Sequence, residues 1–203
     1  MLNLVDMHGS STELRGNVRY AKMGVSDKKP WRIEAVSQRQ IFAESVPILR
    51  RLNDEGFELT RLFAYADGFL QLGTSGDLFS AADLDAMFSS GEIANSAPPK
   101  TLVALPGLGY FCATQQFGGV SNHDRVAEVN DMIHVLQGKP SLLARCRASL
   151  VDYKKAPSAE AREALCAAYQ LVPTHLRPYC GDMDARDTEI RRIIYGSSGT
   201  PPA

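Results

Sequence analysis

The sequence predicts an α+β fold, with an antiparallel sheet of about five or six strands packed with a helical C-terminal half. Alternating apolar residues and turn dipeptides are concentrated before residue 120, and capped apolar runs at helical spacing follow it. Because these segments do not alternate, a doubly wound parallel sheet is disfavoured. We expect one domain over 14–196, strand-rich over 14–120 and helical over 121–196, between a loose N-terminal segment, 1–13, and a loose tail, 197–203.

Turn chemistry separates the predicted strands. Residues 16–24 and 31–35 alternate in polarity, and the turn-forming SDKKP between them predicts a hairpin. In the stretch ELTRLFAYADGFLQLG, two β-rich runs flank Asp67-Gly68, a dipeptide that tolerates the positive φ angles of a type I′ turn. A second hairpin is expected in TLVALPGLGYFCATQQF, around Pro106–Gly109.

Residues 38–53 predict a helix. Ile41, Ile48 and Leu52 fall at helical spacing, and Pro47 either kinks this helix or lies in its first turn. Further helices are marked by capping residues. Each starts at a serine, Ser80, Ser121, Ser141 or Ser158, and each is ended by Gly91, Gly138, Pro157 or Pro173.

Composition disfavours several classes of partner and cofactor. The chain has 203 residues and a formal net charge of -1, and its basic residues cluster only in pairs, so we expect neither nucleic acid nor a membrane surface as partner. No run reaches the roughly 18 apolar residues of a membrane span. The four cysteines match no zinc or redox spacing, which indicates reduced thiols in a cytoplasmic protein. LPGLGYF lacks a third glycine and a following helix, so no nucleotide cofactor is expected.

The segment GDMDARD, residues 181–187, carries the densest charge. A metal site is one interpretation, in which His175, Asp182, Asp184 and Asp187 supply ligands, although the segment lacks the glycine and glutamate of an EF-hand loop. The favoured interpretation is structural: Gly181-Asp182 forms a turn, Asp187 or Thr188 caps a final helix that ends at Gly196, and Arg191 pairs with Asp184. The candidate ligand or partner surface comprises His175, Asp182, Asp184, Asp187 and Arg191.

Aromatic residues supply a second candidate surface. Phe63, Tyr65 and Phe69 crowd around the Asp67-Gly68 turn, and Trp31 begins a predicted strand. Core packing is the favoured interpretation, and a contact surface is the alternative.

These observations favour a small cytoplasmic binding or interaction protein, such as an inhibitor, an immunity-type protein or an accessory protein, whose partner is another protein. The expectation depends on a near-neutral charge and on sites that are explained by local structure. The alternative is a metal-dependent enzyme, such as a hydrolase, that uses His175, Asp182, Asp184 and Asp187.

Overall fold

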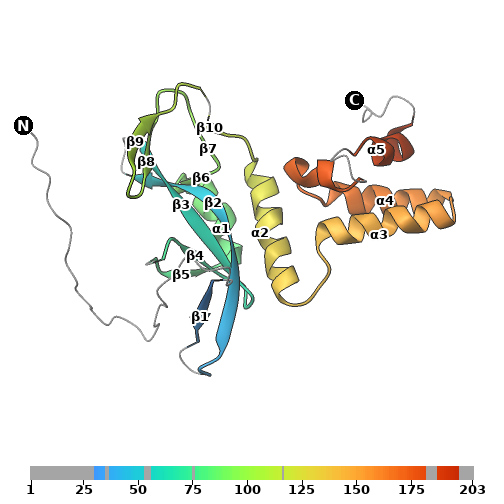
Figure 1. Cartoon of the computed structure of the whole chain (residues 1–203), viewed down its shortest axis with the longest axis horizontal. Coiled ribbons are helices and arrows are strands. Elements are labelled where there is room, and N and C mark those ends of the chain that lie inside the picture. The colour runs from blue at the N-terminus through green and yellow to red at the C-terminus, as the bar shows by residue number, and fades with distance from the viewer. Residues whose placement is uncertain are drawn as a thin grey trace, which may run out of the picture.

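The computed structural model describes residues 30–34, 37–52, 56–74, 76–115, 117–181 and 187–196. It confirms the α+β class: a sheet-rich N-terminal half is followed by helices (Figure 1). The strands are β1 (Trp31–Ile33), β2 (Gln40–Leu52), β3 (Gly56–Tyr65), β4 (Phe69–Leu72), β5 (Leu78–Ser80), β6 (Ile93–Ala94), β7 (Ser96–Ala97), β8 (Leu102–Leu105), β9 (Gly109–Cys112) and β10 (Phe117–Gly118). The helices are α1 (Leu84–Ser90), α2 (Asn122–Leu136), α3 (Leu142–Lys155), α4 (Ala159–Gln170) and α5 (Thr188–Tyr195), with 3-10 helices η1 (Ala81–Asp83) and η2 (Thr174–Tyr179).

The main sheet has eight strands within the described residues, more than the five or six expected. Strand β2 pairs with β1, β3 and β6. Strand β3 also pairs with β4 and β8, and these two strands pair in turn with β5 and β9. Every pairing in this sheet is antiparallel except that of β3 with β8. Strands β7 and β10 form a separate antiparallel pair. The strand expected at residues 16–24 lies outside the described residues.

The helix predicted over residues 38–53 is wrong. Most of this segment forms strand β2, which pairs with β3 in a long antiparallel ladder. Strand β2 pairs with β3 from Ala43 to Leu52. Val46 and Ile48 are buried on one face of the sheet, whereas Ala43 and Leu49 are buried in other clusters. A strand with both faces buried has a nearly continuous apolar run, and such a run also satisfies helical spacing.

The position of Pro47 explains why a proline is tolerated inside this strand. The amide of Gly73 donates to the carbonyl oxygen of Arg61 at 2.8 Å, so the backbone polar groups of Arg61 point toward β4. Arg61 is the register partner of Pro47, and that pair therefore exchanges no ladder hydrogen bonds. On the other side of β2, β1 pairs only as far as Phe42 and β6 begins at Leu49. The missing N–H of Pro47 thus removes no sheet hydrogen bond.

Two of the three predicted hairpins lie within the described residues and are confirmed, and both use three-residue loops. Strands β3 and β4 flank residues 66–68, and β8 and β9 flank residues 106–108. Among the described non-glycine residues, only Gln38 and Lys100 have positive φ, so Asp67 does not form the type I′ turn that its sequence suggested. Gly68, at φ 88°, instead supplies the single left-handed residue that follows a type I turn in three-residue hairpins.

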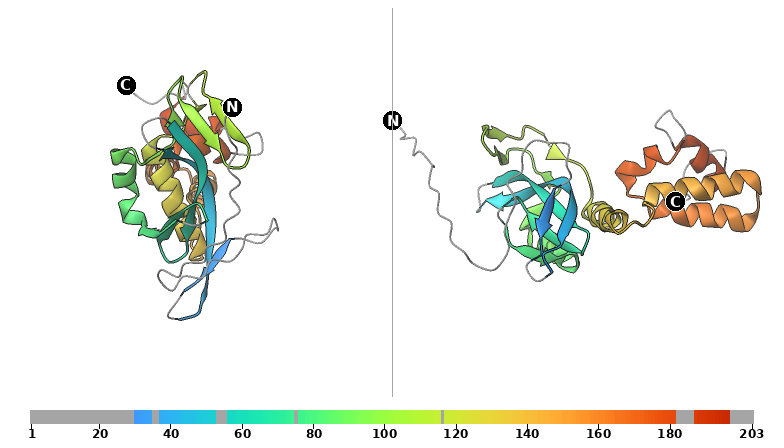
Figure 2. Two further views of the ribbon diagram at one scale, coloured as in Figure 1. Left: turned by 90° about the vertical axis from the view of Figure 1, so that its left-hand side faces the viewer. Right: turned by 60° about the horizontal axis from the view of Figure 1, so that its bottom comes forward.

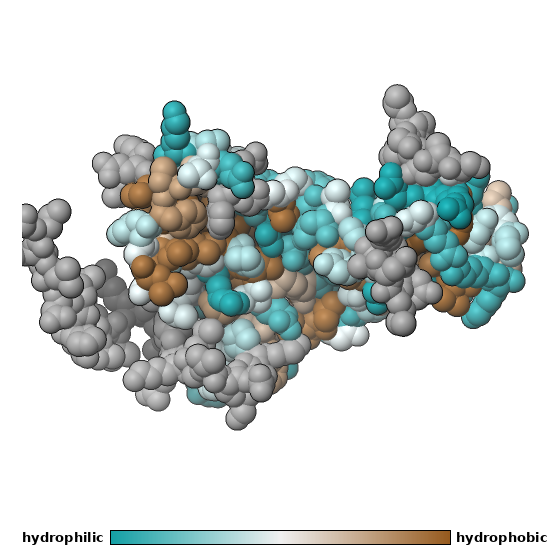
Figure 3. Space-filling view, turned by 45° about the horizontal axis from the view of Figure 1, so that its top comes forward, coloured by the Kyte–Doolittle hydropathy of each residue, from teal (hydrophilic) through white to brown (hydrophobic). Residues whose placement is uncertain are grey.

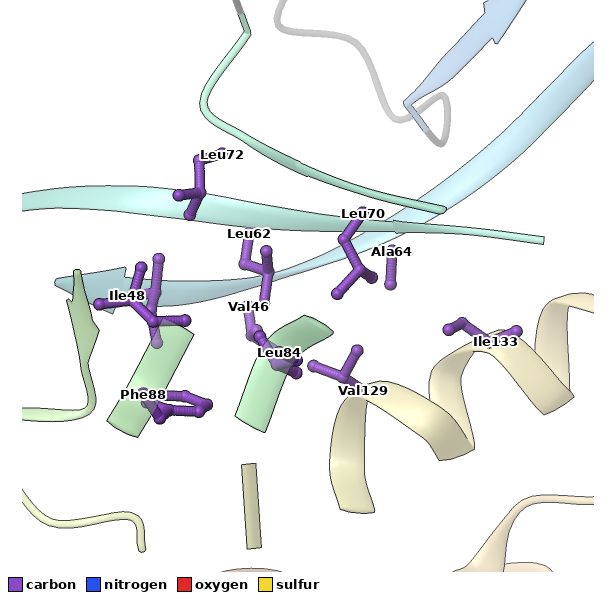
Figure 4. Close-up of a cluster of buried hydrophobic side chains, with 11 residues drawn as sticks. Val46, Ile48, Leu62, Ala64, Leu70, Leu72, Leu84, Phe88, Val129 and Ile133 are labelled. Atoms are coloured by element: carbon purple, nitrogen blue, oxygen red, sulfur yellow. The ribbon is translucent and has the colours of Figure 1, made fainter. Parts of the chain in front are cut away.

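Helices α1 and α2 cover one face of the sheet (Figure 2, left). Between them and the strands lies the largest core cluster, shown in Figure 4, in which Leu62 and Leu70 meet Leu84, Phe88 and Val129. Helix α1 follows η1, which starts at the expected Ser80 with a capping box formed by Ser80 and Asp83, and α1 ends at the expected Gly91, whose φ is 74°. Local signals therefore position the helix that closes the core.

The remaining helices pack around a second core. Leu150, Leu165, Tyr169, Cys180 and Ile190 are among the buried residues that join α3, α4, η2 and α5. This helical unit extends away from the sheet, with α2 between the two parts (Figure 1 and Figure 2, right). The expected serine caps are confirmed, because the side chains of Ser121, Ser141 and Ser158 accept backbone N–H groups at the starts of α2, α3 and α4.

The close approach of β8 to β3 requires a glycine at position 56, and a substitution there tests this packing. A Cβ atom at Gly56 would lie 2.3 Å from the carbonyl oxygen of Leu102, its partner on β8. We expect Gly56→Ala to lower the free energy of unfolding by about 1–3 kcal/mol, because the backbone of β8 must move. Urea denaturation measures this difference. Gly119→Ala is the matched control, since a Cβ atom there meets nothing within 4 Å. Equal effects of the two substitutions would contradict the assigned packing.

Candidate functional site

The described members of the predicted C-terminal site have different neighbours. His175 lies on η2 beside α2, and Asp187 precedes α5 and contacts α4. Asp182 and Asp184 lie outside the described residues. Within the described part of the chain, no three His, Cys, Asp or Glu side chains are grouped as a metal site requires.

Asp187 packs the last helix against the helical core. It occupies the N-cap position of α5, but its side chain makes no capping hydrogen bond. Its carboxylate instead accepts the hydroxyl of Tyr169. Burial and this hydrogen bond both raise the pKa of Tyr169. Arg191, half-buried on α5, donates its backbone N–H to the carbonyl of Asp187. The described contacts of Asp187 therefore give it a structural role.

His175 belongs to a polar junction between α2 and η2. Its Nε2 lies 3.2 Å from a carboxylate oxygen of Glu128, an ion pair when the imidazole is protonated. The contact is not aligned as a hydrogen bond, and both ring nitrogens are buried. Arg125 is itself buried and donates to Glu128 at 2.6 Å and to the side-chain oxygen of Asn95 at 3.0 Å. The amide of Asn95 donates in turn to Asn122. The junction is thus a connected network that reaches from the sheet-rich half to η2.

Two aspartates on α2 complete this junction. Asp124 accepts the backbone N–H of Thr174 at 2.9 Å, and Asp131 accepts that of Leu142 at 2.8 Å. Burial alone would raise the pKa of Asp124, but hydrogen bonds from Thr174 and Ser121 and the nearby His175 lower it below its ordinary value. Burial raises the pKa of Asp131, and the Leu142 bond offsets only part of that effect. Carboxylates on α2 therefore receive backbone donors at the starts of both η2 and α3.

The aromatic candidates near the β3–β4 turn are divided between core and surface. Phe63 and Tyr65 are buried, whereas Phe69 is exposed and Trp31 is half-buried. The guanidinium of Arg32 lies over the rings of Tyr65 and Phe69, at 5.0 and 5.9 Å from their centroids, and it is ion-paired with Asp67. These contacts close the hairpin against β1.

A different hairpin, β8–β9, carries the two most exposed large apolar side chains among the described residues, together with the exposed Leu102. Leu108 is 85% exposed, Tyr110 71% and Leu102 41%. Leu102 pairs with Cys112, and Ala104 with Tyr110, so these four side chains share one face of the hairpin. Val103 and Phe111, on the opposite face, pack into a core cluster. Figure 3 shows apolar residues gathered at the end of the molecule where Figure 1 places this hairpin.

This surface, which we call the hairpin surface, comprises Leu102, Leu108, Tyr110 and Cys112. The sequence predicted the hairpin but did not identify it as a site. A signal was present, because residues 101–117 contain no Asp, Glu, Lys or Arg. A hairpin that buries one face normally carries polar or charged residues on the other. The absence of charge from residues 101–117 is therefore more than the burial of one face of the hairpin requires.

The chain belongs to a family described as a domain of unknown function, DUF7638, whose model matches residues 31–140, more than half of the sequence. A second domain of unknown function, DUF7639, matches residues 141–202. The boundary between these matches lies between α2 and α3. No curated protein and no solved structure matches the chain. Within the described residues, no helix is long and apolar enough to cross a membrane.

The lowered pKa of Asp124 predicts how the junction responds to pH. Folding favours the charged carboxylate, so its stabilisation is present above the ordinary pKa of 3.8 and is lost as pH falls through the lower folded value. We expect Asp124→Asn to lower the free energy of unfolding by at most about 1 kcal/mol near neutral pH, because the site is partly solvated. The gap between wild type and variant should close below pH ~4.

Chemical denaturation between pH 3 and pH 7 measures this gap. Asp85→Asn, on the solvent side of α1, controls for the removal of a carboxylate elsewhere on the surface. A gap between wild type and Asp124→Asn that stays constant down to pH 3 would contradict the role assigned to the Asp124 charge.

Proposed function

We propose that this chain is a cytoplasmic protein-binding protein, such as an inhibitor or an accessory protein, and that the β8–β9 hairpin contacts its partner. The main observation behind the proposal is an uncharged hairpin with exposed apolar side chains, whose outer strand β9 pairs with β8 alone among the described strands. The four cysteines are free thiols, which agrees with a cytoplasmic location. The family descriptions assign no activity.

The first support for the proposal is the position of β9 at an edge of the sheet. Within the described residues, β9 pairs with β8 alone. Sheet edges are commonly protected by charged side chains, prolines or a covering element, because an open edge accepts a further strand. The residues of β9, Gly109–Cys112, include no charge and no proline. Such an edge suits addition of a partner's strand, in which main-chain hydrogen bonds provide much of the affinity.

The side chains beside this edge support the proposal second. Tyr110 and Leu108 stand in solvent on a hairpin whose other face is anchored in a core by Val103 and Phe111. Tyrosine is enriched among the residues that dominate binding energy, and a rigid backbone reduces the entropy lost on association. The hairpin surface therefore combines apolar contact area with a preformed backbone.

The proposal predicts that a hairpin-surface variant loses its partner while it keeps its fold. We expect the double variant Leu108→Ser with Tyr110→Ser to bind the partner recovered from the native host at least about tenfold more weakly. Because both side chains are exposed, its thermal unfolding should match that of wild type. Cross-linked pull-down identifies the partner, calorimetry with the purified partner measures affinity, and hydrogen exchange should show protection of β9 in the complex.

The matched control is Val151→Ser with Leu171→Ser, which removes two exposed apolar side chains from the helical unit. This control should bind the partner as wild type does. Recovery of no partner, or equal binding by the two double variants, would contradict the proposal.

A further inference from the structure

The sheet contains a gap beside the middle of β3. Strand β4 pairs with Leu62–Ala64, and β8 pairs with Gly56–Glu58, so neither strand pairs with residues 59–61 in the sheet register. Gly73, at φ 64°, turns the chain away after β4, and Pro106 follows β8 and cannot donate a backbone hydrogen bond. The ends of two strands thus leave an opening along one side of β3.

A cavity of about 530 Å³ occupies this opening. Its size falls within the range of roughly 300–1,000 Å³ that is typical of small-molecule sites. The apolar part of its wall comes from β2, β3, β4 and the β8–β9 turn: Pro47, Leu59, Phe63, Leu72 and Pro106. The polar part comprises Arg50, Glu58, Thr60, Arg61 and Thr74. The wall thus combines five apolar with five polar side chains, and ligand sites likewise join apolar lining to polar groups that orient the ligand.

The charges in the wall indicate the kind of ligand. Arg50 and Glu58 are register partners and form an ion pair, so their charges largely cancel. Arg61 lies across from Pro47 and donates from one guanidinium nitrogen to the hydroxyl of Ser45 at 2.9 Å. Among the described residues, no carboxylate forms an ion pair with Arg61, so its positive charge is available to a ligand. A guanidinium matches the geometry of a carboxylate, with two parallel N–H donors.

We infer that this cavity binds a small organic monocarboxylate with an apolar body. Arg61 receives the carboxylate, and the apolar body lies against Leu59 and Phe63, which share with Arg61 one face of β3. A single negative charge suits the site, because two arginines face one glutamate. None of the four residues of the hairpin surface lines this cavity, so the two proposed sites can be tested separately.

Isothermal titration calorimetry with a matched set of probes tests the inference. The set is 3-phenylpropionate, its uncharged amide and the corresponding amine, 3-phenylpropylamine. We expect the carboxylate to bind wild type at least about tenfold more tightly than the amide, because it adds a charge-assisted hydrogen bond. The amine should be the weakest of the three. Binding of the amide or the amine as tightly as the carboxylate, or no measurable binding of the carboxylate, would overturn the inference.

Two variants locate the site. Arg61→Gln removes an exposed charge, and we expect it to weaken 3-phenylpropionate about tenfold while the amide is unaffected. Thr74→Trp places a bulky ring at the exposed rim and should weaken both probes. Arg192→Gln, an exposed arginine on α5, is the matched control and should bind as wild type does. Equal affinities of Arg61→Gln and Arg192→Gln for the carboxylate would overturn the assignment.

The variant Leu108→Ser with Tyr110→Ser separates this inference from the proposed function. It should bind 3-phenylpropionate with the wild-type affinity, because neither side chain lines the cavity. Loss of probe binding in this variant, with its thermal unfolding unchanged, would contradict an independent site.

Discussion

The antiparallel ladder between β2 and β3 is the interaction on which the rest of the structure depends. These two strands pair over almost their whole described length, and every other strand of the main sheet joins one of them or a strand attached to them. Helices α1 and α2 pack on the face that carries Val46, Ile48 and Leu62. A shift of one residue in this register would turn those side chains to the opposite face. The register of β2 and β3 thus decides which side chains of the sheet face α1 and α2.

Helix α2 serves both halves of the molecule. Val129 and Ile133 are buried against the sheet, while Asp124, Glu128 and Asp131 contact the helical unit. The division follows from chemistry: apolar contacts fasten α2 to the sheet, and charge-assisted hydrogen bonds connect it to η2 and α3. The junction depends on a few half-buried carboxylates, whereas each half has its own hydrophobic core, so we expect the two halves to depend mainly on those cores for stability.

The two proposed binding features share one structural origin, because both arise where strands leave β3. Strand β8 pairs with only the first residues of β3, and its hairpin then projects with Leu102, Tyr110 and Cys112 exposed on one face. Strand β4 pairs nearer the other end, and the cavity lies beside residues 59–61, which neither β4 nor β8 pairs with in the sheet register. Gly56, Gly73 and Pro106 are therefore the residues at which the chain geometry shapes both proposed sites.

Features whose signals lie in neighbouring residues could be predicted from the sequence. Ser121, Ser141 and Ser158 start helices because each side chain reaches a backbone N–H within three residues, and Gly68 permits a hairpin wherever that hairpin lies. Residues 40–52 required tertiary structure, because their apolar run suits either a helix or a strand buried on both faces, and only pairing with β3 decides between them. The candidate sites were decided in the same way. His175 meets Glu128, and Tyr110 stays in solvent, because elements distant in the sequence cover one side chain and leave the other exposed.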